Sequence, residues 1–217
     1  MVDPSEVAAR VHEVRSNITK AGGKNVALIA VTKTFGIDAI NAAFMAGCDG
    51  IGENYAQELL AKIDDGIPSI DVHFIGAVQS NKVRQLAGHV ALWQSIDRVS
   101  VIAELAKRDP GARILLQVDT TGEPTKGGVP PNDLDALRAS AETVGLVVEG
   151  LMTIGPTHGD HAARAASFSL LRSLVDSQGL GVCSMGMSDD YEQAVANGST
   201  MVRVGSGIFG PRPSPKH

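Results

Sequence analysis

Two hydrophobic periods alternate along most of this chain, and the alternation limits the folds that it can adopt. Apolar runs such as 26–31 are too short for helices and are typical of strands buried on both faces of a parallel sheet. Between these runs, apolar residues recur every three or four positions, as on one face of a helix. The pattern predicts strands in the segments 26–31, 50–52, 72–76, 91–96, 113–118, 146–154, 181–185 and 201–204.

Eight strands that alternate with helices through short loops favour a single closed α/β barrel of the (β/α)8 TIM type over an open doubly wound sheet. An extra helix is expected before the first strand, because Asp3 can cap it, Pro4 suits its first turn and Val7 begins a helical stripe. We expect one domain over 1–217, with its core at about 26–210 and no C-terminal β domain.

Charge and composition exclude several classes of function. The net charge of -5 and an aromatic content of 4% disfavour nucleic-acid binding, which needs basic surfaces and stacking side chains. Cys48 and Cys183 lack the spacing of a zinc site or a disulfide framework, and no metal is expected. The N-terminus has no signal-peptide pattern, and no apolar stretch approaches 18 residues. These features predict a cytoplasmic protein that does not enter membranes.

Barrels of this type carry their active sites at the carboxyl ends of the strands, so polar residues that follow each apolar run are the site candidates. These candidates are Lys33; Glu53 and Asn54; Gln79, Asn81 and Lys82; Asp97 and Arg98; Ser184; and the segment 203–206.

Lys33 directly follows the first buried strand. Desolvation and neighbouring cations in such a position lower the pKa of an amine and make it nucleophilic toward a carbonyl group. A solvated loop lysine is the structural alternative.

Two loops suit an anion. The glycine-rich segment 204–208 can present backbone N–H groups to phosphate, and barrel phosphate sites favour the loops after strands seven and eight. In the segment 184–188, Ser188 is expected to cap a helix whose N-terminus would also favour an anion. A plain turn is the alternative for the glycine-rich segment.

Five motifs occur in order along the chain and together resemble the pyridoxal phosphate homeostasis protein family. The resemblance runs from about Val26 to Arg212. The motifs are Ala-Val-Thr-Lys at 30–33, Gly-Glu-Asn-Tyr at 52–55, His-Phe-Ile-Gly at 73–76 with Gln-Ser-Asn-Lys at 79–82, Ser-Met-Gly-Met-Ser at 184–188, and Val-Arg-Val-Gly at 202–205 with Ile-Phe-Gly at 208–210.

The resemblance implies a fold similar to the barrel domain of alanine racemase and pyridoxal 5′-phosphate bound as an imine to Lys33. It also implies roles for five further residues. Ser184 and the backbone of Gly205 and Ser206 would hold the phosphate, Asn54 would lie near the cofactor, and Arg203 would face the pyridine nitrogen. Whether Lys82 or Lys126 contacts the cofactor stays open.

Three functions are compatible with these residues. The leading one is a pyridoxal phosphate-binding protein that takes part in intracellular vitamin B6 homeostasis without catalytic residues, with apo pyridoxal phosphate-dependent enzymes as candidate recipients. The second is an amino-acid racemase, which is disfavoured because racemisation needs two acid/base groups and Lys33 supplies one. The third is an enzyme that acts on a phosphorylated metabolite without a cofactor. A monomer or weak dimer is expected.

Overall fold

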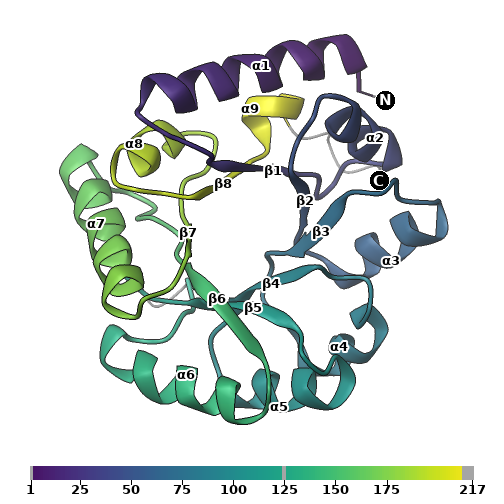
Figure 1. The fold of residues 1–217 in the computed structure, drawn as a ribbon. Helices are drawn as coiled ribbons and strands as arrows, with labels where there is room; N and C mark the ends of the chain where they lie inside the picture. Colours follow the sequence, from purple (N-terminus) through teal and green to yellow (C-terminus); the bar gives the residue numbers. More distant parts are fainter. Residues whose placement is uncertain (1, 124–125, 212–217) are drawn as a thin grey trace.

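The computed structural model of the chain describes residues 2–123 and 126–211 and shows a closed parallel barrel (Figure 1). The strands follow one another around the barrel in sequence order, and β8 pairs with β1 to close it. The expected (β/α)8 barrel is therefore confirmed. The strands are β1 (Ala27–Val31), β2 (Gly50–Glu53), β3 (Asp71–Phe74), β4 (Leu92–Ile96), β5 (Arg113–Gln117), β6 (Val147–Met152), β7 (Val182–Ser184) and β8 (Met201–Val204).

The strands carry continuous apolar runs because both of their faces are buried. Inside the barrel, Ile29, Leu92, Leu115, Met152 and Met201 form one cluster. The outward-facing residues pack against the helices in a second, larger cluster. The helical elements are α1 (Pro4–Lys20), α2 (Ile37–Met45), α3 (Ala56–Asp64), α4 (Ser80–Leu86), α5 (Val99–Arg108), η1 (Pro131–Asp133), α6 (Leu134–Thr143), α7 (His161–Ser177), α8 (Tyr191–Ala196) and α9 (Ser206–Phe209).

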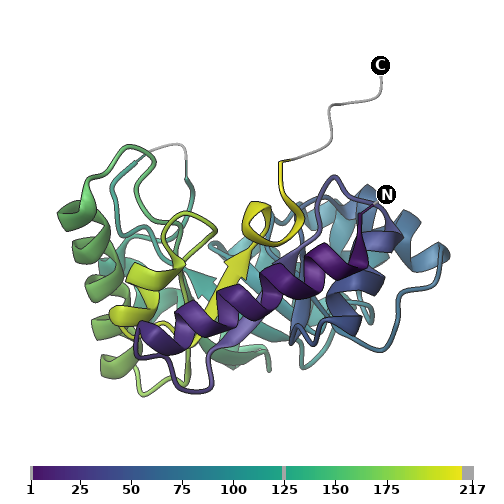
Figure 2. The ribbon, with the colours of Figure 1, turned by 90° about the horizontal axis from the view of Figure 1, so that it is seen from above.

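The extra N-terminal helix α1 forms as predicted and covers the region where the barrel closes. The carboxylate of Asp3 accepts a hydrogen bond from the Ser5 N–H group at 2.8 Å, which satisfies one of the donors at the helix start. The buried stripe begins at Val7 and ends at Ile18. Figure 2 shows α1 running across the outside of the barrel, where it packs against α2, α8 and α9.

The predicted strand bounds were too wide at several ends. The segment 146–154 forms a strand only over Val147–Met152, and Ile154 beyond the strand lines the mouth of the barrel. Residues 1, 124–125 and 212–217 belong to the predicted domain but lie outside the described residues. Within the described part of the chain, no helix has the length and apolar character needed to span a bilayer.

Candidate functional site

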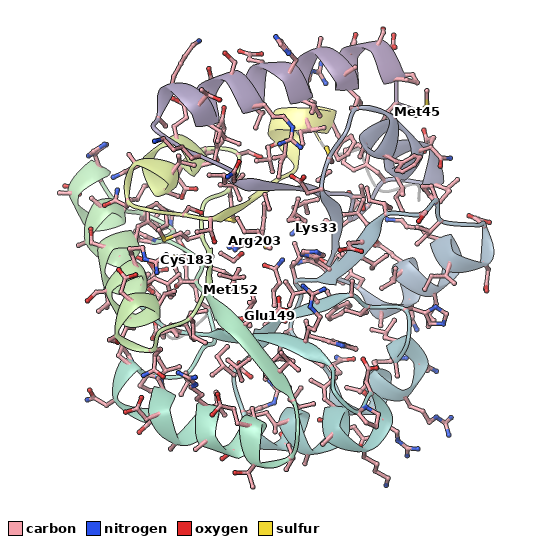
Figure 3. The ribbon with its side chains drawn as sticks, in the orientation of Figure 1. Lys33, Met45, Glu149, Met152, Cys183 and Arg203 are labelled. Carbon is pink, nitrogen blue, oxygen red and sulfur yellow. The ribbon has the colours of Figure 1, made fainter. Side chains whose placement is uncertain are left out.

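A cavity of about 440 Å³ opens at the carboxyl ends of the strands. Figure 3 shows Lys33 and Arg203 directed toward the middle of the barrel. Apolar side chains from β1, β6 and the loops after β3 and β6 form much of the cavity wall. The residues predicted for the cofactor that line the cavity are Lys33, Asn54, Arg203, Gly205 and Ser206.

Lys33 occupies a tight turn immediately after β1. The Phe35 N–H group donates to the Thr32 carbonyl oxygen at 3.1 Å and closes the turn. Thr34 has a φ of 69°, a conformation that β-branched residues rarely adopt and that costs about 1 to 3 kcal/mol. Its N–H group donates to the Glu58 carboxylate of α3 at 2.8 Å. The turn is thus held in a strained shape that directs Lys33 toward the cavity.

A buried ion pair supports the same turn from behind. The Lys62 ammonium donates to Glu53 at 2.5 Å and to the Thr32 carbonyl oxygen at 2.8 Å. Glu53 also accepts from the Thr32 hydroxyl at 2.6 Å, while its Oε2 atom is buried without a partner. Burial raises the pKa of Glu53, and the charge of Lys62 opposes that rise. Helix α3 therefore fixes the residues on both sides of Lys33.

Arg203 forms the floor of the cavity and is almost completely buried. Its guanidinium group donates to the Ser184 hydroxyl at 2.5 Å and to the Thr153 carbonyl oxygen at 2.7 Å. None of the ion pairs formed within the described residues includes Arg203. Burial lowers its pKa to about 10, so the group still carries its charge at neutral pH. A buried cation of this kind favours a ligand atom that accepts hydrogen bonds.

Ser184, which was predicted to contact the phosphate, is not among the residues that line the cavity. It is fully buried inside the barrel, where its hydroxyl donates to Gln94 Oε1 at 2.7 Å and accepts from Arg203. The Gln94 amide nitrogen lies 2.7 Å from His73 Nδ1 and donates to it. Burial lowers the pKa of His73 to about 4, so the ring is neutral at pH 7. Ser184 thus belongs to a polar chain that runs from Arg203 into the barrel.

Ser188, four residues after Ser184, does line the cavity. It does not cap a helix, because Tyr191 is the first residue of α8 and Asp190 occupies the N-cap position. Its hydroxyl oxygen instead accepts hydrogen bonds from the Gly205 and Gly207 N–H groups, each at 3.1 Å. A hydroxyl that accepts two bonds is a stronger donor, and its own proton is available to an anion in the cavity.

Close packing fixes the loops around the cavity. Gly186 has a φ of 96°, and a Cβ atom there would come within 2.6 Å of the Ala194 side chain, so only glycine fits the loop after β7. On the opposite side, the rings of Phe35 and Phe209 lie 5.1 Å apart and connect the Lys33 turn to α9. The cavity wall is therefore set by packed elements.

The two other candidate lysines lie outside this cavity. Lys126 is nearly buried, contacts the Gly155 carbonyl oxygen and lies 3.3 Å from the Glu123 carboxylate. Lys82 lines a second, neighbouring cavity to which Asn54 also contributes. Neither ammonium group lines the cavity that contains Lys33.

The two cysteines are buried and free. Burial raises the pKa of Cys48 to about 11 and that of Cys183 to about 12, so both remain thiols at neutral pH. Among the described residues, no group of three or more His, Cys, Asp or Glu side chains is placed to hold a metal ion.

The arrangement suits a phosphorylated carbonyl compound that contains a hydrogen-bond acceptor. One cavity with apolar walls is lined by the Lys33 amine, by the buried guanidinium of Arg203, and by Ser188 and the glycine-rich loop after β8. The amine can form a reversible bond to a carbonyl carbon, and the other two groups can orient the rest of the molecule.

Comparison with known proteins connects this chain to a family. Residues 2–213 match the family described as alanine racemase, N-terminal domain. A pyridoxal phosphate homeostasis protein from Pseudomonas aeruginosa is 39% identical over 220 residues, which cover 96% of this chain and 94% of that protein. PipY from Synechococcus elongatus, solved with pyridoxal phosphate bound, has a TM-score of 0.83 and 32% identity over 94% of this chain and 100% of its own.

Alanine racemase from Corynebacterium glutamicum shows the same fold. Its TM-score is 0.77 at 17% identity, and the match covers 99% of this chain and 63% of the racemase. At this identity the likeness concerns the fold alone.

Proposed function

The chain belongs to the pyridoxal phosphate homeostasis protein family, and on that premise we propose that it holds pyridoxal 5′-phosphate as an imine of Lys33 and takes part in intracellular vitamin B6 homeostasis. The observation that carries the proposal is the convergence of Lys33, Arg203 and Ser188 on one cavity. When bound, the cofactor supplies an aldehyde carbon that a lysine amine can capture reversibly.

The residues of the cavity fit this cofactor. The charged, buried Arg203 would donate to the pyridine nitrogen, which accepts hydrogen bonds when it is unprotonated. Met152, Ile75 and Ile154 offer apolar surfaces for the ring. Asn54 would lie beside it.

For the phosphate, we propose the Ser188 hydroxyl together with the Ser206 N–H group, while the Gly205 N–H group holds Ser188 in place by donating to its oxygen. All three residues line the cavity, and the hydroxyl of Ser188 is polarised by the N–H groups that it accepts from. Ser184 would act indirectly, by holding the guanidinium of Arg203 in place.

We further propose that the protein does not catalyse racemisation efficiently. Arg203 only donates hydrogen bonds, so it cannot accept one from a protonated pyridine nitrogen, and an unprotonated ring is a weaker electron sink for a carbanion. Of the two tyrosines, Tyr191 has its hydroxyl 3.1 Å from Asn17 and Tyr55 lines the neighbouring cavity, so neither is placed as a second base. Asp189 is the only carboxylate among the described lining residues, and it is exposed.

Solvent deuterium incorporation into L- and D-alanine tests this part of the proposal. The loaded protein should exchange the Cα proton far more slowly than an authentic racemase under the same conditions. Inversion at a comparable rate would favour the racemase instead, with Asp189 as the first residue to substitute.

Borohydride reduction followed by peptide mass mapping tests the cofactor assignment. The pyridoxyl group should be found on Lys33, and Lys33→Ala should remove the visible imine absorbance while Lys126→Ala retains it. Labelling at Lys82 or Lys126 with none at Lys33 would sink the assignment. A protein without visible absorbance that gains none on adding pyridoxal phosphate would favour an enzyme of phosphorylated metabolites.

Delivery to apo enzymes stays a prediction. Mixing the loaded protein with an apo pyridoxal phosphate-dependent enzyme should restore that enzyme's activity faster than free dissociation of the cofactor allows. Equal rates would mean that the protein acts as a reservoir and makes no direct transfer.

A further inference from the structure

A second cavity of about 370 Å³ lies beside the first at the carboxyl ends of β2 and β3. The proposed cofactor does not use it, although the Gln-Ser-Asn-Lys motif at 79–82 contributes to its wall. Asn54 is the residue that lines both cavities. The residues that line the second cavity are Asn54, Tyr55, Ala56, Gln57, Phe74, Gly76, Ala77, Gln79 and Lys82.

The polar side chains of this cavity have no partners within the part of the chain that the structure describes. The side chains of Tyr55, Gln57, Gln79 and Lys82 make no hydrogen bond or ion pair with another described residue. The Oδ1 atom of Asn54 is buried and also has no partner. In the first cavity, by contrast, the side chains of Arg203 and Ser188 form hydrogen bonds with other groups of the protein. The second cavity thus gathers polar groups that the fold does not use, and the Lys82 ammonium and the Gln57 and Gln79 amides are the donors among them.

The chemistry of this set favours an anion. Lys82 supplies a positive charge, Gln57 and Gln79 supply amide donors, and none of the described residues that line the cavity carries a carboxylate. The nearby acidic groups are engaged elsewhere, because Glu53 pairs with Lys62 and Glu58 accepts the Thr34 N–H group. A cation without a competing carboxylate binds carboxylate or phosphate oxygens through charge-assisted hydrogen bonds.

The apolar part of the wall favours an organic ligand over a bare ion. Phe74 is buried beneath the cavity, and Gly76 and Ala77 add small apolar surfaces next to it. Ligand sites commonly combine such apolar walls with a few polar groups that fix the orientation.

We propose that this second cavity binds a small organic anion, a carboxylate or a phosphate ester, with Lys82 as its charge partner. The site is separate from the one that Lys33 serves, so the proposal goes beyond the cofactor function. Its ligand would bind while the first cavity is occupied.

Titration of isotopically labelled, cofactor-loaded protein tests the proposal by amide chemical shifts. The probes are benzoate, phenyl phosphate, inorganic phosphate and the neutral benzyl alcohol. Benzoate or phenyl phosphate should give saturable shifts in Gly76, Ala77 and Lys82, and benzyl alcohol should give none. Which of the two organic anions binds more tightly identifies the anionic group. Binding of inorganic phosphate alone would overturn the proposal, as would shifts confined to 188 and 205–206.

Substitutions of Lys82 provide the second arm. Lys82→Met should weaken binding of the organic anion roughly 10-fold or more, because a charge-assisted contact is lost. Lys82→Arg should retain much of the affinity. Lys107→Met removes an exposed lysine on α5 and serves as the matched control, with no expected change. Equal affinity in Lys82→Met and the unchanged protein would overturn the proposal.

Two further controls distinguish failure of the second site from unfolding of the variant and from failure of the cofactor proposal. If Lys82→Met unfolds, Gln79→Ala replaces it, because Gln79 is exposed and lines the same cavity. Lys82→Met should still be labelled at Lys33 by borohydride. Failure of that labelling in the unchanged protein would contradict the cofactor function, whereas failure of benzoate and phenyl phosphate to bind would contradict only the second site.

Discussion

At the scale of single residues, Ser188 connects the loop after β7 to the loop after β8 through one oxygen atom. Ser188→Ala should weaken binding of pyridoxal phosphate about 10-fold, because a donor to the phosphate and the link between the loops are both lost. Binding of pyridoxal, which has no phosphate, should change little. Titrations with the two compounds measure the difference, and an equal loss for both would contradict a role in holding the phosphate.

The buried ring of His73 should make stability depend on pH. Its pKa is about 4 in the folded protein and near 6.5 when exposed, so between these values the unfolded chain binds the extra proton. Stability should therefore fall by up to about 3 kcal/mol as the pH decreases from 6.5 to 4. Urea unfolding at a series of pH values measures this loss.

His73→Gln should flatten that part of the pH profile, since glutamine does not titrate and can still accept a bond from Gln94. An unchanged profile in the variant would assign the pH dependence to other groups.

Some site residues could be predicted from the sequence and others could not. Lys33 and Arg203 stand at strand ends, where the barrel geometry alone makes them candidates. Ser184 also stands at a strand end, but its side chain points into the barrel and meets Gln94, which is 90 residues away in the sequence. No local pattern indicates that pairing, so the proposal of Ser188 for the phosphate could not be made from the sequence.

At the scale of elements, α3 acts as the support of the Lys33 turn. Lys62→Met should destabilise the protein by about 3 to 5 kcal/mol, because Glu53 would remain buried without its partner. The double variant Glu53→Leu with Lys62→Met should recover part of this loss, since no unpaired charge remains. Chemical denaturation measures both, with Lys107→Met as a control. A loss below 1 kcal/mol for Lys62→Met would contradict the supporting role.

The periodicity predicted the order and type of the strands and helices, because burial on one or two faces leaves a direct trace in the sequence. It misplaced the start of α8. Serine is a common N-cap residue, so Ser188 was a natural choice for the cap. In the structure, however, the Met187 N–H group donates to the Asp190 carboxylate at 2.6 Å and forms a turn, and the helix begins only at Tyr191. Ser188 then points to the glycine loop.

At the scale of the whole molecule, the cavity joins elements from both ends of the chain, so its occupation should stabilise the complete barrel. Pyridoxal phosphate at 100 times its dissociation constant should add about 2.7 kcal/mol and raise the melting temperature. Lys33→Ala at the same cofactor concentration should show a much smaller rise. Thermal unfolding of both proteins measures this, and an equal rise would indicate binding at a different place.

The number of strands favours a closed barrel, but closure depends on contacts between the first and last strands, which hydrophobic periodicity does not reveal. Ile29 on β1 pairs with Arg203 on β8, at nearly opposite ends of the chain. The same pairing brings the Lys33 turn beside the glycine loop. The architecture could therefore be inferred from the sequence, whereas the fine geometry of the site could not.

Because Asn54 lines both cavities, a molecule that moves its side chain from one cavity would change the environment of a molecule in the other. Thermodynamic linkage then requires the effect to be reciprocal: if benzoate changes the affinity for pyridoxal phosphate by some factor, pyridoxal phosphate changes the affinity for benzoate by the same factor. We expect Asn54→Ala to bring that factor closer to one while each site still binds, and paired titrations would measure it. The amount of cofactor that the protein retains would then depend on the concentration of a second metabolite, and the side-chain amide of Asn54 would transmit this dependence.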